Sequence, residues 1–427
     1  MRRFRYLILL LVVLLSLVSG ARNVILFIGD GMGPNQVSIA NYVYYKNTGE
    51  NLIFFDFPFL SFVDTNNASN QVTDSAAAAT SFAIGLRTNN GIVGLDQREK
   101  VQENVSEKAK SLGKSVGIVT DTSITDATPA AFVAHTNSRR NSDVISAAFL
   151  DLQPDVFMGM GLSSFTLSGR SQKGWDNRDL IKELQDLSYQ VVYDRSSMDQ
   201  STSPKLAGFF NNISYAFTQR GPFRTQPNLK EMTKKSLEIL SQNENGFFLM
   251  VEAAVIDGSG HNNDVVGTIY DVWALEEAVK EALLFREKHP ETLIIVTADH
   301  ETGGMTLDPN TFPLLLERLS EVTRITPQIE SMLGSSPTLQ WARYVFEDSG
   351  IEVKEADLQT IVKATSGRAA LVGKAITKYV GGAKYSTTGH SSQRVQLFAV
   401  GKGADRIPKE LKNYEFGKLL AQFVTEE

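Results

Sequence analysis

Three apolar runs constrain the fold of this chain more than any other feature. Residues 24–28, 247–251 and 292–297 are apolar and rich in β-branched side chains, with almost no polar positions among them. Such runs predict strands that are buried on both faces, as in a parallel sheet with helices on each side. We therefore predict an α/β fold, a three-layer α/β/α sandwich around a large, mostly parallel central sheet.

Each of these runs leads into acidic residues. Asp30 follows the first run between Gly29 and Gly31, Glu252 ends the second, and Asp299 follows the third. Open α/β sheets bind ligands at the carboxyl ends of their strands, and glycines allow the backbone to approach a ligand closely. A helix cap is the alternative role for Asp30 alone, but several acids at one sheet edge indicate a binding site.

Histidines accompany the acids. His261 follows Asp257 by four residues, His300 comes directly after the acid of the third run, and His390 precedes a predicted last strand at residues 395–400. A combination of Asp and His favours zinc. His390 can join the other histidines only if the last strand is antiparallel or its loop folds back over the site.

Ser75 stands at the start of an alanine-rich run that predicts a helix. Backbone N–H groups and the helix dipole at such a position attract an anion and favour a deprotonated hydroxyl. A plain capping serine is the alternative. No Gly-x-Ser-x-Gly elbow surrounds Ser75, which disfavours a Ser-His-Asp hydrolase.

Pro129 predicts the first turn of another helix, with Asp126 and Thr128 in the loop before it and Arg139 beyond its end. A solvated surface charge is the alternative role for Arg139.

The candidate ligands are too many for one ion. Glu252 within an apolar strand is costly unless it meets a cation, and hard oxygen ligands favour magnesium. We therefore predict two zinc ions and one magnesium ion. A serine, a helix N-terminus, an arginine and two transition metals together indicate phosphoryl transfer. The candidate ligands are Asp30, Ser75, Thr128, Glu252, Asp257, His261, Asp299, His300 and His390.

Composition narrows the possible partners. The net charge is −6 and no basic block or stripe occurs, so we expect no nucleic-acid-specific binding. The chain has no cysteine, so disulfides are excluded and any metal must be held by histidine and oxygen ligands.

Two segments of the chain differ from the predicted α/β domain: the N-terminal residues and an internal helical stretch. Residues 1–21 have a basic start, an apolar core and small residues before the end, which predicts a secretory signal peptide. An uncleaved membrane anchor is the alternative; after cleavage we expect no membrane contact and a periplasmic or extracellular location. Residues 22–427 would form the α/β domain. Within it, residues from about 305 to 385 show only amphipathic helical segments and predict a helical, crown-like insertion.

The motifs, in their order and spacing, resemble the alkaline phosphatase family from the first strand to the last. The helical insertion is covered only loosely by this resemblance. The matching motifs are Ile28-Gly29-Asp30-Gly31-Met32-Gly33, Thr73-Asp74-Ser75-Ala76-Ala77, Asp126-Ala127-Thr128-Pro129, Ser138-Arg139, Val251-Glu252-Ala253 with Asp257 and His261, Thr297-Ala298-Asp299-His300, and Thr388-Gly389-His390.

The resemblance implies a role for each candidate residue. Ser75 resembles the nucleophile that becomes phosphoserine, and Arg139 resembles the arginine that binds two phosphate oxygens. It also implies phosphate monoesters as substrates and a homodimer, and substitution of cobalt for zinc stays open. The implied metal sites are Asp257, His261 and His390 for the first zinc; Asp30, Asp299, His300 and Ser75 for the second; and Asp30, Thr128 and Glu252 for magnesium.

Two positions vary within the family that this chain resembles. Asp126 stands where many members have histidine, and its presence here favours magnesium over zinc at the third site. Gly258 stands where members often have a lysine, histidine or tryptophan that contacts phosphate. Because glycine has no side chain, we predict weaker retention of phosphate than in members with lysine.

The leading hypothesis is a secreted phosphomonoesterase with a phosphoserine intermediate. A phosphodiesterase or sulfatase of the same superfamily is a rival hypothesis. Residues 75–78 lack the sulfatase motif, and Arg139 favours a monoester dianion over a diester. A non-catalytic metal- or phosphate-binding protein of the cell envelope is the other alternative, but such a protein has no use for an activated Ser75.

Overall fold

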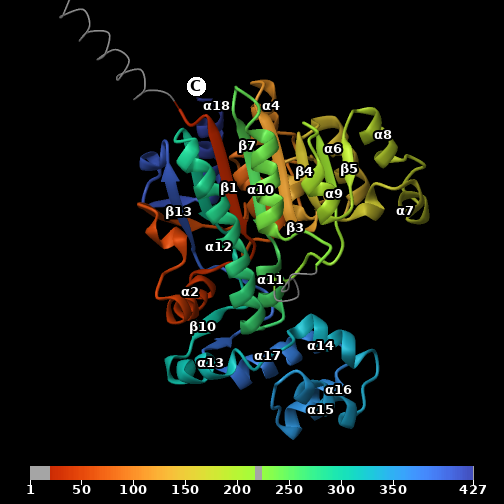
Figure 1. Cartoon of the computed structure of the whole chain (residues 1–427), viewed down its shortest axis with the longest axis vertical. Helices are drawn as coiled ribbons and strands as arrows, with labels where there is room; N and C mark the ends of the chain where they lie inside the picture. The colour runs from red at the N-terminus through yellow and green to blue at the C-terminus, as the bar shows by residue number, and fades with distance from the viewer. Residues whose placement is uncertain (1–19, 217–223, 427) are drawn as a thin grey trace, which may run out of the picture.

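A ten-stranded sheet forms the centre of the protein in the computed structural model, which describes residues 20–216 and 224–426 (Figure 1). The strand order is β14-β2-β13-β8-β1-β7-β3-β4-β6-β5. The predicted signal peptide lies almost wholly outside the described residues. The strands are β1 Asn23–Gly29, β2 Phe59–Asp64, β3 Ser115–Ser123, β4 Val156–Met160, β5 Gln190–Val192, β6 Leu206–Phe209, β7 Phe247–Ala253, β8 Thr292–Thr297, β13 Val395–Gly401 and β14 Glu410–Lys412.

The three apolar runs of the sequence are the three central strands. β1 pairs in parallel with β7 on one side and β8 on the other, and every residue of the three strands is buried. Ile28 at the end of β1 lies opposite Glu252 of β7 and Thr297 of β8. This register brings the acids that follow the three runs to one edge of the sheet.

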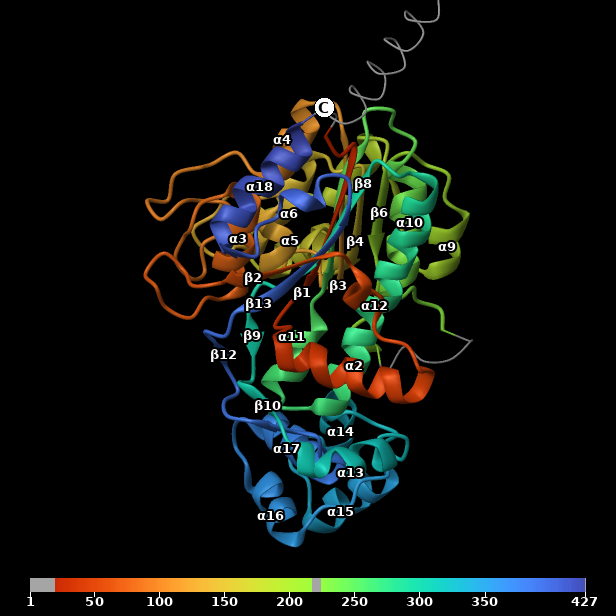
Figure 2. The same ribbon diagram turned by 90° about the vertical axis from the view of Figure 1, so that its left-hand side faces the viewer.

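Helices cover both faces of the sheet, which confirms the predicted three-layer sandwich (Figure 2). On one face lie α10 (Leu229–Leu240) and α12 (Val265–Lys288), and α2 (Pro34–Thr48) packs across α12. The helices of the opposite face are α3 Ser75–Ile84, α4 Val105–Ser111, α5 Ala127–Ala131, α6 Ser142–Leu152 and α18 Asn413–Thr425.

The strand β13 is antiparallel to both of its neighbours, as the placement of His390 required. Its first residue therefore lies at the edge where the parallel strands end. The segment before it forms β12 (His390–Ser391), which pairs antiparallel with β9 (Glu301–Thr302), so that His390 lies opposite Thr302. Three strands of the central sheet, β2, β6 and β14, were not predicted.

Five helices and a small antiparallel sheet extend from the sandwich beyond α2 and α12 (Figure 1). The chain enters through β10 (Met305–Leu307) and returns through β11 (Ala383–Tyr385), which pair with each other. The helices form a second apolar cluster that includes side chains of α2 and α12. They are α13 Phe312–Arg318, α14 Thr326–Leu333, α15 Leu339–Asp348, α16 Glu355–Lys363 and α17 Arg368–Val380.

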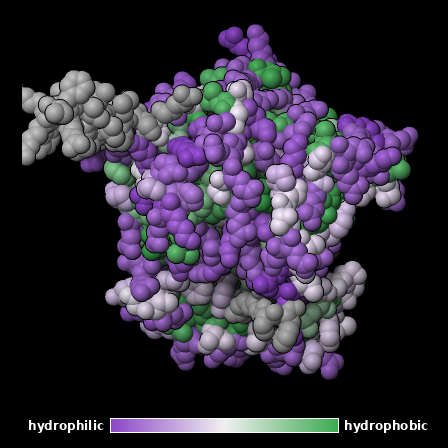
Figure 3. Space-filling model, turned by 45° about the horizontal axis from the view of Figure 1, so that its top comes forward, coloured by the Kyte–Doolittle hydropathy of each residue, from purple (hydrophilic) through white to green (hydrophobic). Residues whose placement is uncertain are grey.

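The surface is mostly polar on the face seen in Figure 3, with apolar side chains scattered singly or in small groups. None of the helices within residues 20–216 and 224–426 combines the length and the apolar character that crossing a bilayer requires.

Candidate active site

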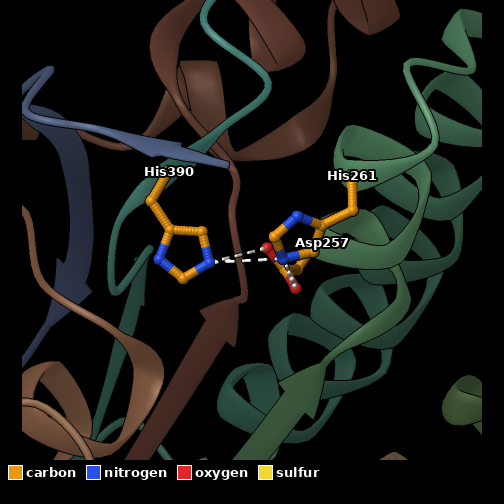
Figure 4. Close-up of side chains that lie close together, drawn as sticks. All are labelled: Asp257, His261 and His390. Atoms are coloured by element: carbon orange, nitrogen blue, oxygen red, sulfur yellow. Dashed lines mark hydrogen bonds and ion pairs between the residues drawn. The ribbon is translucent and has the colours of Figure 1, made fainter. Parts of the chain in front are cut away.

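A first group of ligand atoms comes from α11 (Val255–His261) and from β12. Asp257 and His261 lie one turn apart on α11, and His390 points toward them from the opposite side (Figure 4). Asp257 Oδ2 lies 3.1 Å from His261 Nε2, and Asp257 Oδ1 lies 3.6 Å from His390 Nε2. All three ligand atoms fall within 4.8 Å of one another, as the ligands of a single ion do.

Backbone carbonyls determine which nitrogen of each imidazole faces this group. Thr388 O accepts from His261 Nδ1 at 2.5 Å, and Thr73 O accepts from His390 Nδ1 at 2.8 Å. Because a carbonyl can only accept, Nδ1 carries a proton and Nε2 is the nitrogen that faces the group. The hydrogen bond to Asp257 raises the pKa of His261 to about 9, so a cation bound here would displace the proton from His261 Nε2. The two Nε2 atoms lie 3.3 Å apart, so both could bind one cation.

A second group surrounds Ser75 at the ends of β1 and β8. Asp30, Asp299 and His300 are buried and supply three atoms that could hold an ion. His300 Nε2 lies 3.3 Å from Ser75 Oγ, 3.3 Å from Asp299 Oδ2 and 3.4 Å from Asp30 Oδ1. Among the described residues, Asp30 Oδ1 and Asp299 Oδ2 have no hydrogen-bond partner. Buried oxygens without partners are rare, so these two fit a cation-binding role.

The charged form of the buried carboxyl groups in this site is unfavourable without a cation nearby. Burial, reinforced by neighbouring acids, raises the pKa of Asp30 well above its ordinary value, and burial raises the pKa of Asp299 to about 7. Burial also raises the pKa of Glu252. His300 responds in the opposite direction, because burial lowers the pKa of its imidazole and keeps it neutral, as a metal ligand must be. A divalent cation would offset the buried negative charge, so the residues present fit such an ion.

The residues that the sequence analysis assigned to a third metal lie around Glu252. Glu252 Oε2 accepts a 2.5 Å hydrogen bond from Thr120. The nearby Thr128 Oγ1 is buried without a partner of hydrogen-bond geometry among the described residues. Asp126 pairs with Arg139, although its charge also contributes to the raised pKa of Glu252. Asp126 lies in the loop directly before α5 and caps that helix, as predicted, whereas Thr128 lies inside α5, so its predicted loop position was wrong.

Ser75 is the first residue of α3, as predicted, and its side chain is buried. Asp74 caps the helix by accepting from Ala77 N at 3.0 Å. The other carboxylate oxygen of Asp74 lies 3.4 Å from Arg139 Nη1, and Asp126 Oδ1 lies 2.9 Å from Arg139 Nη2. Burial opposes the charge of Arg139, but Asp126 and then Asp74 outweigh burial and raise its pKa. The guanidinium is therefore held in its charged form beside the nucleophile candidate.

Other residues that hold the site together were missed from the sequence. Thr302 Oγ1 donates to Asp257 and lies 3.3 Å from His300 Nδ1, so one hydroxyl touches both groups. The buried Glu301 accepts from Gln36, Ser391 and two backbone amides, which fixes β9 and β12. Their only sequence signal is their place directly after His300. His135 and His289, in contrast, lie outside both groups.

Comparison with known proteins gives the family. The family model described as alkaline phosphatase matches residues 21–425. Alkaline phosphatase 4 of Bacillus subtilis (strain 168) is 31% identical over 419 residues, covering 93% of this chain and 88% of its own length.

Solved structures with a similar fold belong to the same family as the sequence relatives. The crystal structure of Thermus thermophilus alkaline phosphatase aligns with a TM-score of 0.87 and 25% identity, covering 96% of this chain and 92% of its own. A variant of TAB5 alkaline phosphatase with Mg bound in its M3 site aligns with a TM-score of 0.71 and 25% identity, covering 96% and 99%. Together with the fold and with Ser75 beside the second ligand group, these matches show that the chain belongs to the alkaline phosphatase family, enzymes that hydrolyse phosphate monoesters.

Proposed function

We propose that this phosphatase is a secreted enzyme that acts through a phosphoserine at Ser75, with two zinc ions and one magnesium ion. The observation that carries the proposal is the position of Ser75 Oγ, 3.3 Å from His300 Nε2 and at the N-terminus of α3. When bound, the metal ions supply Lewis-acid chemistry, which lowers the pKa of a hydroxyl and offsets developing negative charge.

Ser75 forms and then loses one covalent bond in this scheme. Its Oγ attacks phosphorus in line with the ester oxygen, the phosphorus–ester bond breaks, and the serine proton ends on the leaving alcohol. Water then attacks phosphoserine, which releases inorganic phosphate and restores the Ser75 hydroxyl. The amides at the start of α3 favour negative charge at this position throughout.

Arg139 orients the phosphoryl group. Its guanidinium presents two N–H groups that match two phosphate oxygens, a geometry that favours the dianion of a monoester. Asp74 and Asp126 hold the guanidinium near Ser75, so phosphate would meet an arginine that is already positioned.

The donor chemistry supports the metal assignment. Two groups that combine carboxylates with imidazole suit zinc, and the oxygen set of Asp30, Thr128 and Glu252 suits magnesium. Asp126 in place of a histidine favours magnesium at the third site, and the TAB5 variant binds Mg in its M3 site. Cobalt substitution for zinc stays open.

Replacing Arg139 by alanine is expected to raise the inhibition constant for inorganic phosphate about 10- to 100-fold, because two charge-assisted hydrogen bonds are lost. The preference for a monoester over a diester should fall as well. Hydrolysis of p-nitrophenyl phosphate and bis-p-nitrophenyl phosphate measures this, with Arg140→Ala as the exposed neighbouring control. If the wild-type enzyme hydrolysed the diester faster than the monoester, the proposed function would be wrong.

The quaternary structure is part of the proposal. We assign a homodimer, with the helical segment from about 305 to 385 as a crown over the site or a subunit contact, and removal of residues 1–21 on export to the periplasm or the cell exterior. Multi-angle light scattering of the mature chain is expected to give twice the chain mass. A monomeric mass across the micromolar range would contradict the dimer.

A further inference from the structure

Tyr215 has an unusual backbone conformation next to the site. Its φ is +62°, in the left-handed region that residues with side chains rarely adopt. Holding a residue there is unfavourable and requires surroundings that over-determine the conformation. Such positions cluster where a side chain is aimed at a ligand.

Hydrogen bonds on both sides hold Tyr215 in this conformation. Ser214 Oγ donates to the carbonyl oxygen of Asp121 at 3.0 Å, and Ala216 N donates to Asp271 Oδ1 at 2.9 Å. Asp271 is fully buried on α12, and the metal chemistry does not use it. One of its carboxylate oxygens thus helps to fix the backbone around Tyr215.

The same two aspartates also hold α11, the helix that carries Asp257 and His261. Asp271 Oδ2 accepts from Ser259 Oγ at 2.7 Å, and Asp121 Oδ1 accepts from Ala254 N at 2.8 Å. The backbone of Tyr215 and the metal-binding helix are thus tied to common anchors. This arrangement restrains the backbone at Tyr215 relative to the helix that carries Asp257.

The hydroxyl of Tyr215 lies against Gly258. A Cβ built at Gly258 would lie 2.8 Å from Tyr215 Oη. Gly258 has no positive φ and lies within a helix, where glycine is less favourable than alanine. Because the backbone does not need glycine there, the feature that glycine provides is space for the hydroxyl.

The other faces of α11 are already occupied. Asp257 and His261 face the first ligand group, Ser259 faces Asp271, and a Cβ at Gly260 would meet Thr302. The face at Gly258, which borders Asp257, is the one against which the tyrosine hydroxyl is seated.

We infer that Tyr215 is a substrate-contact residue whose hydroxyl donates a hydrogen bond to a phosphoryl oxygen at the edge of the first ligand group. It thereby supplies the phosphate contact that a side chain at Gly258 could not. This inference rests on the proposed function, because it takes the phosphoryl group to lie between Ser75 and Asp257. No bond is made or broken at Tyr215.

The ionisation of Tyr215 agrees with a donor role. Burial, followed by the charge of Asp271 and other acids, raises the pKa of the hydroxyl to about 12. A tyrosine hydroxyl is protonated at neutral pH, and burial favours this neutral form further. A neutral donor also suits a site with many carboxylates, because it adds no negative charge to repel phosphate.

Replacing Tyr215 by phenylalanine tests the inference in the metal-loaded enzyme. We expect the dissociation constant of inorganic phosphate, measured by calorimetry, to rise about 10-fold, as for loss of one hydrogen bond to a charged group. Zinc content, magnesium content and the melting temperature should stay unchanged. Tyr45→Phe, at an exposed tyrosine of α2, is the matched control.

A second variant separates contact with phosphate from a structural role. Gly258→Ala places a methyl group where the hydroxyl lies, so it should weaken phosphate binding in the wild type and add little in Tyr215→Phe. Unchanged phosphate binding in Tyr215→Phe, or additive effects of the two variants, would overturn the inference. If the wild type itself formed no phosphoserine, the proposed function would fail, whatever Tyr215 does.

Discussion

Replacing Ser75 by alanine is expected to lower kcat/KM for a phosphate monoester by about 10³-fold or more, as loss of a covalent nucleophile does in other hydrolases. Ser75 Oγ lies both at the N-terminus of α3 and in contact with His300. No hydroxyl in the described part of the chain shares that position. Steady-state hydrolysis of p-nitrophenyl phosphate measures the loss.

Two controls keep the Ser75 result interpretable. Ser111→Ala, at the exposed end of α4, should leave the rate unchanged. Ser75→Ala should still contain zinc and magnesium and still bind inorganic phosphate, because Asp30, Asp299 and His300 remain in place. Equal rates in Ser75→Ala and wild type, with metals retained, would defeat the nucleophile assignment.

Removing the metals with a chelator is expected to abolish activity and to lower the melting temperature by about 10 °C. The physical reason is the buried negative charge of Asp30, Asp299 and Glu252, which the ions offset. A site saturated about 1,000-fold above its dissociation constant contributes about 4 kcal/mol of stability, and two or three such sites give a shift of this size. Differential scanning calorimetry before and after chelation measures it.

The metal-free protein should also respond to pH in a defined direction. The folded pKa of Asp299, about 7, lies above the unfolded value, so the folded state binds more protons than the unfolded state between these values. The free energy of unfolding of the metal-free protein should therefore fall as pH rises from about 4 to about 7. Restoring zinc and magnesium should recover both activity and stability. A chelated protein that keeps its activity and its melting temperature would contradict the metal assignment.

The central strands could be predicted because the sequence pattern that indicates each of them lies within the strand itself. The runs that became β1, β7 and β8 are apolar throughout, and Asp30 and Asp299 follow them directly. The same holds for Ser75, since an alanine-rich helix starts wherever a good cap precedes it. β6 and β14 are too short to leave a pattern.

Other parts of the site depend on contacts between distant segments. α11 was not predicted, because Gly258 and Gly260 disfavour a helix, and contacts with β9 and α12 and hydrogen bonds to Asp121 and Asp271 stabilise one there. The pairing of Arg139 with Asp74 joins residues 65 positions apart, and the contact of Thr302 with Asp257 spans 45 positions. In neither pair does the sequence around one residue indicate which distant residue it contacts. Tyr215 is the extreme case, since its role follows only from its backbone conformation and its place beside α11.

The most direct test of the account is to trap the covalent intermediate. The metal-loaded enzyme is mixed with a phosphate monoester, quenched with acid within milliseconds, digested and analysed by mass spectrometry. We expect one phosphorylated peptide, with the phosphate on Ser75, and none from Ser75→Ala treated in the same way. Full turnover in the wild type without phosphate on Ser75, or with the phosphate on another residue, would contradict it.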